Sequence, residues 1–135
     1  MPHLTLDYSA NLRVDGDFSE LCKKLARTLI AQRAGDKPVY PVGGVRVRAF
    51  AAEDYCIADD SINAAYVHAR LAVGAGRSEV VLKETGDALF QAMKSHFDAL
   101  YKRQGLALSL EIAEFSEAGT WKHNNLHSLL NKAGQ

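Results

Sequence analysis

The sequence has no excess of charge of either sign, because 16 lysines and arginines balance 16 aspartates and glutamates among 135 residues. A nucleic-acid-binding domain usually carries a basic excess, so this balance argues against a nucleic-acid partner. The sequence also has no apolar run of the roughly 20 residues that a membrane-spanning helix needs. No basic segment leads into an apolar one, as it does in a secretory signal peptide. We therefore expect a cytoplasmic protein with no nucleic-acid or membrane partner.

Cysteine is scarce, and no pattern of metal ligands is complete. Cys22 and Cys56 form no C-x-x-C pair, so neither a disulfide nor a thiolate metal site is expected. His123 and His127 have the i, i+4 spacing of two ligands on a helix. Asn124, however, stands where a metalloprotease helix has glutamate, and no third ligand is evident. We predict no metal site.

The glycines form no nucleotide-binding motif. Residues 74–76 read Gly-Ala-Gly, but Glu79 stands where a dinucleotide motif has its third glycine. The pair of glycines at residues 43–44 does not lead into a helix. Ser78 lacks the flanking glycines of a serine-hydrolase elbow. These departures exclude a nucleotide site and a serine nucleophile of that type.

The first half of the sequence has the pattern of a strand, a helix and a second strand. Residues His3–Tyr8 and Val45–Phe50 alternate between two faces, as strands do. Between them, Asp17–Ala34 repeats apolar residues at i, i+3, i+4 and i+7, which is typical of one helix face. Asp17 is the expected N-cap of a capping box, and Gly35 is the expected end of the helix.

The second half repeats this order after a polar segment. Asp36–Gly44, which is rich in proline and glycine, is expected to form a loop before the second strand. Tyr66–Val73 alternates like a strand, and Ser78 is a natural N-cap for a helix over Glu79–Arg103. Leu106–Ala113 alternates again and predicts the last strand.

Together these elements predict an α+β fold. Two tandem β-α-β units form a four-stranded sheet with two helices on one face, in a single domain of residues 1–135. The other sheet face would carry four basic side chains, Arg46, Arg48, His68 and Arg70. A face of this kind in a small protein usually meets another subunit. Trp121–Leu130 predicts a short C-terminal helix, which should dock on another surface because so short a helix is marginal alone.

Pro2 directly follows Met1 and is one of only three prolines. Proline nitrogen within a chain is an amide without a proton, but removal of Met1 would leave a secondary amine. An α-amino group has a reference pKa of about 7.7–8.0, and burial or nearby cations would lower that pKa. Pro2 is therefore a candidate base. From these residues alone, a proline that merely begins a strand is the simpler interpretation, because a perturbed group functions only with suitable neighbours.

Arg77 is the sharpest candidate for binding an anion. It lies between the Gly-x-Gly turn and the start of a helix, where free N–H groups and the helix dipole favour negative charge. Its guanidinium could hold a carboxylate by two parallel hydrogen bonds, and the alternative is a solvated arginine at a turn. Arg46 and Arg48 are further candidates, although arginines on a strand more often form surface or inter-subunit ion pairs.

Six segments form a pattern that extends over nearly the whole chain: Met1-Pro2-His3, Val45–Arg48, Val67–Ser78, Ser95–Phe97, Leu106–Ile112 and Lys122–His127. In this order, with proline after Met1, they resemble the tautomerase superfamily, and most closely the 5-carboxymethyl-2-hydroxymuconate isomerases. The segment Gln32–Pro41 departs from that pattern, because it is longer than the resemblance leads us to expect.

The resemblance implies a cofactor-independent isomerase that moves a proton of a 2-hydroxydienoate to give a 2-oxo-enoate, in the degradation of aromatic compounds such as homoprotocatechuate. It implies Pro2 as the general base, Arg46 and Arg77 as catalytic and substrate-binding residues, and Arg48 as a further substrate-binding residue. The substrate would be an unsaturated dicarboxylate or tricarboxylate. No cofactor is implied, since proton transfer needs only a base of suitable pKa. The active sites would lie near the subunit boundaries of a homotrimer.

Two alternatives stay open at this point. A tautomerase of a monocarboxylic 2-oxo acid would keep the fold and the proline, but would depend less on Arg46 than on Arg77. A non-catalytic trimeric binding module would keep the fold alone, and Pro2→Ala would then have no rate to lower.

Overall fold

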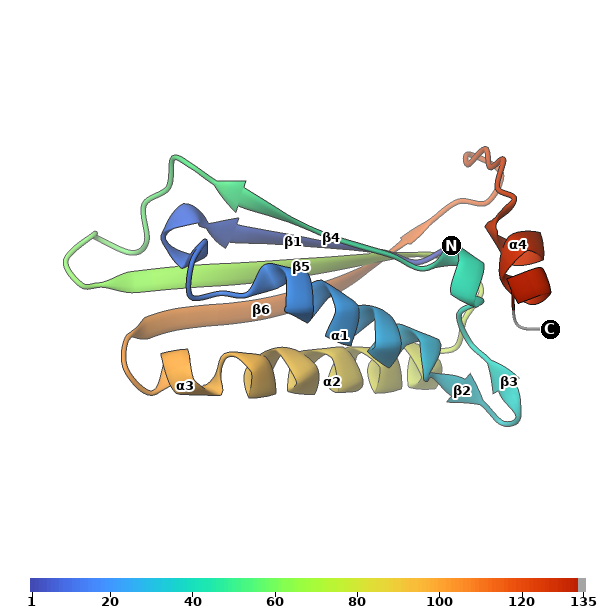
Figure 1. Ribbon diagram of the computed structural model, residues 1–135, viewed down its shortest axis with the longest axis horizontal. Coiled ribbons are helices and arrows are strands. Elements are labelled where there is room, and N and C mark those ends of the chain that lie inside the picture. The colour runs from blue at the N-terminus through green and yellow to red at the C-terminus, as the bar shows by residue number, and fades with distance from the viewer. Residues whose placement is uncertain (134–135) are drawn as a thin grey trace.

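The computed structural model describes residues 1–133, and its centre is a four-stranded sheet covered on one face by two helices (Figure 1). The strands lie in the order β4 (Arg46–Ala52), β1 (His3–Ser9), β5 (Ala64–Gly74) and β6 (Gly105–Phe115). β1 is parallel to β4, β5 is parallel to β6, and the central pair β1 and β5 is antiparallel. This arrangement confirms the predicted α+β fold of two β-α-β units.

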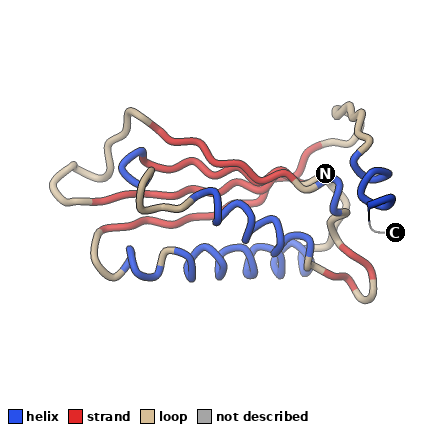
Figure 2. The backbone as a smooth tube through the Cα atoms, in the orientation of Figure 1, coloured by secondary structure: helices blue, strands red, loops and turns tan. Residues whose placement is uncertain are grey.

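Helices α1 (Phe18–Ile30) and α2 (Glu79–His96) lie side by side on the same face of the sheet (Figure 2). The strand and helix periodicities direct apolar side chains into the space between the two layers. The fully buried side chains there include Leu4, Leu6, Leu21, Leu25, Leu29, Val67, Ala69, Leu71, Leu89 and Met93. Full burial of one leucine contributes about 1.5–3 kcal/mol, so this layer fixes the position of β1 and with it the start of the chain.

Helix α1 ends earlier than the sequence predicts. It stops at Ile30 and not at Ala34, and residues 33–34 instead form β2, which pairs with β3 (Lys37–Pro38). Gly35 has φ +65° and turns this hairpin, so it does not end the helix as predicted. The predicted loop Asp36–Gly44 therefore contains a short strand, and it also contains the 3₁₀ helix η2 (Val42–Gly44).

Asp17 does not form the predicted capping box. Its backbone is left-handed, with φ 46° and ψ 56°, and its side chain makes no capping hydrogen bond. A capping side chain reaches the helix N–H groups from an extended backbone, so the left-handed conformation explains the wrong prediction. Ser78, by contrast, is extended, and its Oγ accepts the Val81 N–H at 3.2 Å. The predicted N-cap of α2 is confirmed.

The second helix is interrupted rather than continuous to Arg103. Helix α2 ends at His96, and the short helix α3 (Asp98–Tyr101) follows after Phe97. Phe97 is only 1% exposed, and its ring centroid lies 5.8 Å from that of Phe18. The break lets this ring enter the core, which a periodicity argument does not detect.

The C-terminal helix also begins later than predicted. Helix α4 spans Leu126–Ala133, whereas residues 121–125 are not helical. The Asn124 Oδ1 atom accepts the Leu126 N–H at 2.7 Å, which sets the start of α4. The helix packs against η2, in agreement with the predicted docking. Within residues 1–133, no helix is both long enough and apolar enough to cross a membrane.

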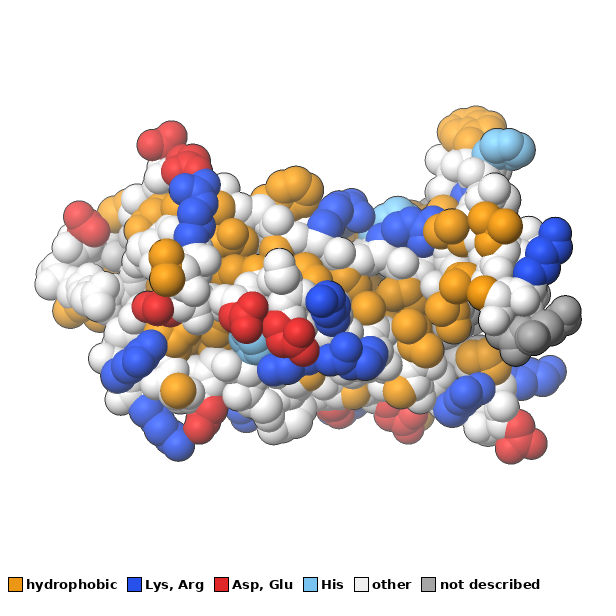
Figure 3. Space-filling model, in the orientation of Figure 1, with side chains coloured by type: hydrophobic (Ala, Val, Ile, Leu, Met, Phe, Trp, Pro, Cys, Tyr) orange, Lys and Arg blue, Asp and Glu red, His pale blue; other side chains and the backbone are white. Residues whose placement is uncertain are grey.

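The sheet face opposite the helices carries the expected polar and basic side chains. A shallow cavity of about 310 Å³ on this face is lined by His3, Thr5, Asp7, Arg48, His68, Arg70 and Ala72. Arg70 Nε lies 3.4 Å from Glu111 Oε1, and His68 Nδ1 lies 2.7 Å from Ser109 Oγ. In space-filling view, basic side chains lie along the β4 side of the molecule toward the end that carries the N-terminus (Figure 3).

Candidate active site

Four segments of the chain meet at the end of the sheet where β1 begins (Figure 1). β1 and β4 both start there, and β5 and β6 both end there, because the central strand pair is antiparallel. The register pairs His3 with Arg46 on β4 and with Ala72 on β5. The topology therefore brings Pro2, Arg46, the turn before Arg77 and the segment after β6 to one place.

A cavity of about 360 Å³ lies beside the first residue of the chain. Its lining residues are Met1, Pro41, Gly44, Lys122, Asn124 and His127. Pro2 is buried behind Met1, and its carbonyl oxygen accepts the Arg46 N–H at 3.1 Å. While Met1 is attached, the Pro2 nitrogen is an amide. A chain without Met1 would begin with a proline amine at the wall of this cavity.

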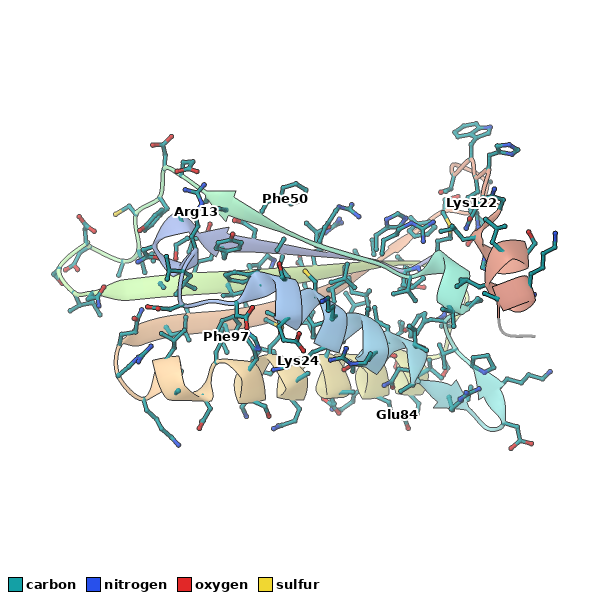
Figure 4. All side chains as sticks on the ribbon, in the orientation of Figure 1. Arg13, Lys24, Phe50, Glu84, Phe97 and Lys122 are labelled. Atoms are coloured by element: carbon teal, nitrogen blue, oxygen red, sulfur yellow. The ribbon has the colours of Figure 1, made fainter. Side chains whose placement is uncertain are left out.

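The amino group of Met1 has a pKa below its ordinary value of 8.0. Burial is the largest cause, followed by the positive charges of Lys122, Arg77 and Arg46, while Glu117 acts in the opposite direction. Figure 4 places Lys122 on the segment between β6 and α4, at the sheet end where the chain begins. An amine in these surroundings is unprotonated at a lower pH than an exposed amine, so it is suited to accept a proton.

Arg46 is held in place by backbone carbonyl groups. Its Nη1 atom donates to the Gly43 carbonyl at 2.9 Å and to the Val45 carbonyl at 3.1 Å. Among the described residues no carboxylate forms a salt bridge with Arg46. Its other N–H groups and its charge are therefore available to an anion.

Arg77 is held in a similar way. Its Nη1 atom donates to the Gly74 carbonyl at 3.1 Å and its Nη2 atom to the Val39 carbonyl at 3.3 Å. The guanidinium carbon lies 4.8 Å from the centre of the Tyr40 ring, which is buried and whose hydroxyl lies 2.9 Å from Thr85 Oγ1. Within residues 1–133, Arg77 also has no salt-bridge partner.

Arg48 follows Arg46 by two residues on β4. It lies on the open face of the sheet, where its Nη1 atom is 3.3 Å from His3 Nδ1. Burial is the largest cause of the lowered pKa of His3, followed by the charges of Arg48 and Arg46. None of the three arginines is among the residues that line the cavity beside Met1, so their roles in substrate binding stay predictions.

The structure adds residues to which the sequence analysis assigned no role. Lys122 and Asn124 line the cavity, and Asn124 Nδ2 donates to the Gly43 carbonyl at 3.1 Å. The ring of Tyr40 lies under the guanidinium carbon of Arg77. The first two lie in a non-helical segment without periodicity, and their separation from Met1 in sequence gives no local signal. Only the strand order places them beside the N-terminus.

The two adjacent glycines of η2 are explained by close packing at this site. A Cβ atom on Gly43 would lie 2.7 Å from His127 Nδ1, and a Cβ atom on Gly44 would lie 3.3 Å from Met1 Cα. Larger residues would push α4 or the start of the chain outward. These glycines therefore permit the contact between the C-terminal segment and the N-terminus.

Comparison with known proteins decides the family of this chain. The model of the 5-carboxymethyl-2-hydroxymuconate isomerase family matches residues 2–130. The chain belongs to this family. A 5-carboxymethyl-2-hydroxymuconate Delta-isomerase of Escherichia coli is 36% identical over 129 residues, which are 96% of this chain and 98% of that protein. The resemblance inferred from the sequence is confirmed.

Solved structures of isomerases of this family have the same fold. A 5-carboxymethyl-2-hydroxymuconate isomerase from Deinococcus radiodurans R1 is 52% identical, with a TM-score of 0.87, over 96% of this chain and 93% of that one. A second 5-carboxymethyl-2-hydroxymuconate delta-isomerase is 33% identical, with a TM-score of 0.89 and the same coverage. A fused 4-OT symmetric trimer shares the fold at 14% identity, with a TM-score of 0.64, over 90% of this chain and 93% of that one.

In this member of the 5-carboxymethyl-2-hydroxymuconate isomerase family, the charged groups around the N-terminus are lysine, arginine and one glutamate. Within residues 1–133, no group of three or more His, Cys, Asp or Glu side chains is placed to hold a metal ion. Three cavities are larger than the one beside Met1: two, of about 550 and 540 Å³, lie along α2 and β6, and one of about 460 Å³ lies between α1 and α2. None of the three is lined by the residues that perturb the N-terminal amine, so we place the candidate active site at the smaller cavity beside Met1.

Proposed function

We propose that this chain is a 5-carboxymethyl-2-hydroxymuconate isomerase in which Pro2, freed by removal of Met1, is the general base. The observation that supports this proposal most directly is the amine at the start of the chain, partly buried and surrounded by Lys122, Arg77 and Arg46. Burial and these cations lower the pKa of the Met1 amine. We expect them to act in the same way on the Pro2 amine that replaces it, as catalysis by a base near neutral pH requires. Family membership supports the choice of substrate.

The reaction requires one proton to move within the substrate. The Pro2 nitrogen accepts the proton of the 2-hydroxyl group, the O–H bond breaks, and the electron pair of the resulting dienolate forms a carbonyl at carbon 2. The protonated proline then delivers the proton to the carbon at the far end of the diene, where a C–H bond forms. The product is a 2-oxo-enoate, and the amine is regenerated, so no cofactor or metal takes part.

Arg46 and Arg77 have two roles in this proposal. Their guanidinium groups bind carboxylates of the substrate and stabilise the negative charge that develops on the enolate oxygen. The backbone carbonyls that hold both side chains keep them in position before the substrate arrives. Arg48, on the open face, remains a predicted further substrate-binding residue, and its charge also adds to the attraction of an anionic substrate.

We further propose that the enzyme is a cytoplasmic homotrimer. The open sheet face carries polar, basic and exposed apolar groups, with Phe50 57% exposed. A face of this composition is expected to meet other subunits. The fused 4-OT with the same fold is a symmetric trimer, and this supports the same assembly here.

The proposal is tested by the steady-state rate on 5-carboxymethyl-2-hydroxymuconate, followed by loss of dienol absorbance. Intact mass must first establish that the protein lacks Met1. We expect a rate far above ketonisation in buffer, and a loss of about 10²–10⁴-fold in Pro2→Ala, the usual contribution of a general base. No rate with a confirmed proline N-terminus would contradict the proposal and favour another 2-oxo acid or a binding role.

A further inference from the structure

Lys122 lies where it can contact a molecule in the cavity beside Met1. It lines that cavity, and its side chain is 36% exposed. Asn124, two residues further on, is fixed to the Gly43 carbonyl by a 3.1 Å hydrogen bond, so the backbone on this side of Lys122 is anchored to the cavity wall. Of the three cations that act on the N-terminal amine, Lys122 is the one that the C-terminal segment supplies.

Within residues 1–133, Glu117 is the only carboxylate among the charged groups that act on the N-terminal amine. Its Oε2 atom lies 3.0 Å from Lys122 Nζ, while its Oε1 atom occupies the position that a Cβ on Gly74 would need. The carbonyl of Gly74 in turn accepts a hydrogen bond from Arg77. The lowered pKa of Glu117 is due first to Lys122, with a smaller contribution from Arg77. A carboxylate of the chain thus lies next to two of the three cations.

The number of cations matches the charge of one substrate. Muconate has a carboxylate at each end, and the 5-carboxymethyl group adds a third. Arg46 and Arg77 account for two of these groups under the proposed function, and a third carboxylate in the cavity would remain without a partner. A buried carboxylate without a partner is strongly unfavourable, so a third cation at this site is needed for a tricarboxylate but not for a dicarboxylate.

We infer that Lys122 binds the third carboxylate of the substrate, and that Glu117 holds Lys122 in place until that carboxylate replaces it. This inference rests on the proposed function, because it assigns a role within the same site. Lys122 is then the residue that favours a tricarboxylate over a dicarboxylate. Glu117 competes with the substrate carboxylate for Lys122, which weakens substrate binding. It also holds the ammonium group of Lys122 in position before the substrate binds.

The test compares two substrates in one set of variants. The tricarboxylate is 5-carboxymethyl-2-hydroxymuconate, and the dicarboxylate is 2-hydroxymuconate, which lacks the carboxymethyl group. Lys122→Met keeps the length of the side chain and removes its charge. We expect KM for the tricarboxylate to rise roughly 10-fold, as for loss of a hydrogen bond to a charged group, while KM for the dicarboxylate changes little. A change in the pKa of the base would alter the rates of both substrates together, so the ratio of their kcat/KM values isolates carboxylate binding.

Two further variants complete the test. Glu117→Gln removes the competing charge and should lower KM for the tricarboxylate a few-fold, opposite to the effect of Lys122→Met. Lys83→Met is the matched control, because Lys83 pairs with Asp87 at the same 3.0 Å distance on the exposed face of α2. It should leave both substrates unaffected.

The outcomes separate this inference from the proposed function. If the wild-type protein turns over both acids and Lys122→Met lowers kcat/KM by the same factor for each, Lys122 does not select the tricarboxylate and the inference is wrong. If a folded Glu117→Gln variant has a raised KM for the tricarboxylate, Glu117 does not compete with the substrate for Lys122. If the wild-type protein without Met1 turns over neither acid, the proposed function itself fails, and the inference fails with it.

Discussion

Backbone carbonyl groups, and not carboxylates, hold the two arginines of the site. Each guanidinium donates to two carbonyl oxygens, from Gly43 and Val45 for Arg46 and from Gly74 and Val39 for Arg77. A carbonyl group positions the side chain without neutralising it, so the positive charge remains for an incoming anion. The same charges lower the pKa of the N-terminal amine. Each of these two arginines is therefore expected to affect both the binding of an anionic substrate and the pKa of the N-terminal amine.

This coupling predicts a pH profile for the processed enzyme. The base is active when unprotonated, so kcat/KM should fall as the pH falls through the pKa of the Pro2 amine. We expect burial and the cations that lower the pKa of the Met1 amine to lower this pKa as well. Arg77→Ala removes one of the charges that lower this pKa. The acid limb of the profile should then move to higher pH, and KM should rise by about 10-fold or more through the lost carboxylate contact.

The control for this profile is Arg27→Ala. Arg27 lies on the exposed side of α1 and pairs with Glu20, and it is not among the charges that act on the amine. Its profile should overlay that of the wild type. An acid limb that stays in place in Arg77→Ala would show that Arg77 does not influence the base.

At the scale of elements, the C-terminal segment completes the site. Helix α4 buries no side chain, and Leu126, Leu129 and Leu130 remain 40–50% exposed. Its position depends on a narrow contact with η2, where the backbone of His127 approaches Gly43. The segment between β6 and α4 carries Lys122, so displacement of α4 should also displace a cation of the site.

Gly43→Ala tests this dependence. The new Cβ would lie 2.7 Å from His127 Nδ1 and 2.9 Å from His127 N, so α4 must move away from η2. We expect faster hydrogen exchange in residues 116–133 and a higher KM, with little change in the exchange of the core strands. Gly119→Ala is the matched control in the same segment, because its nearest neighbour would be 3.9 Å away. Equal exchange in both variants would show that this contact does not hold the helix.

Periodicity in the sequence predicts the elements that are long enough to repeat. The alternation of β1 and β5 and the apolar stripe of α1 identify the two layers, and Ser78 marks the start of α2. The hairpin of β2 and β3 is too short for any repeat, and the break at Phe97 depends on what its ring contacts in the core. The ends of elements are set by such tertiary contacts, so they are predicted less well than the elements themselves.

The same distinction applies to the site. Arg77 is a candidate because of its place between a Gly-x-Gly turn and a helix, whereas Pro2 becomes the predicted base only through the resemblance to the tautomerase superfamily. Lys122 cannot be predicted in this way, because it belongs to a segment without regular structure. It reaches the N-terminus because β6 runs parallel to β5 and ends at the same edge. Long-range strand order, which composition and local pattern do not encode, assembles the last part of the site.

At the scale of the whole molecule, the open face of the sheet is the part that the single chain leaves uncovered. Helices protect one face, and the other carries charged side chains together with Phe50, which is 57% exposed and points away from the helices (Figure 4). An aromatic ring that is exposed on a sheet face contributes little to the stability of the single chain. It contributes to the free energy of association when a second subunit covers it. The proposed homotrimer therefore depends on residues that add little to the stability of the single chain.

Phe50→Asp separates assembly from folding. Sedimentation of the wild type should give three times the chain mass of 14.7 kDa, whereas Phe50→Asp should shift the equilibrium toward single chains and keep the far-ultraviolet circular dichroism of the fold. Val80→Asp is the control, because Val80 is 66% exposed on α2, on the helical layer, and this variant should remain trimeric. A wild-type mass of one chain would contradict the trimer, and a trimeric Phe50→Asp would move the interface away from this end of the face. If activity falls together with the trimer, the cavity beside Met1 also requires a neighbouring subunit.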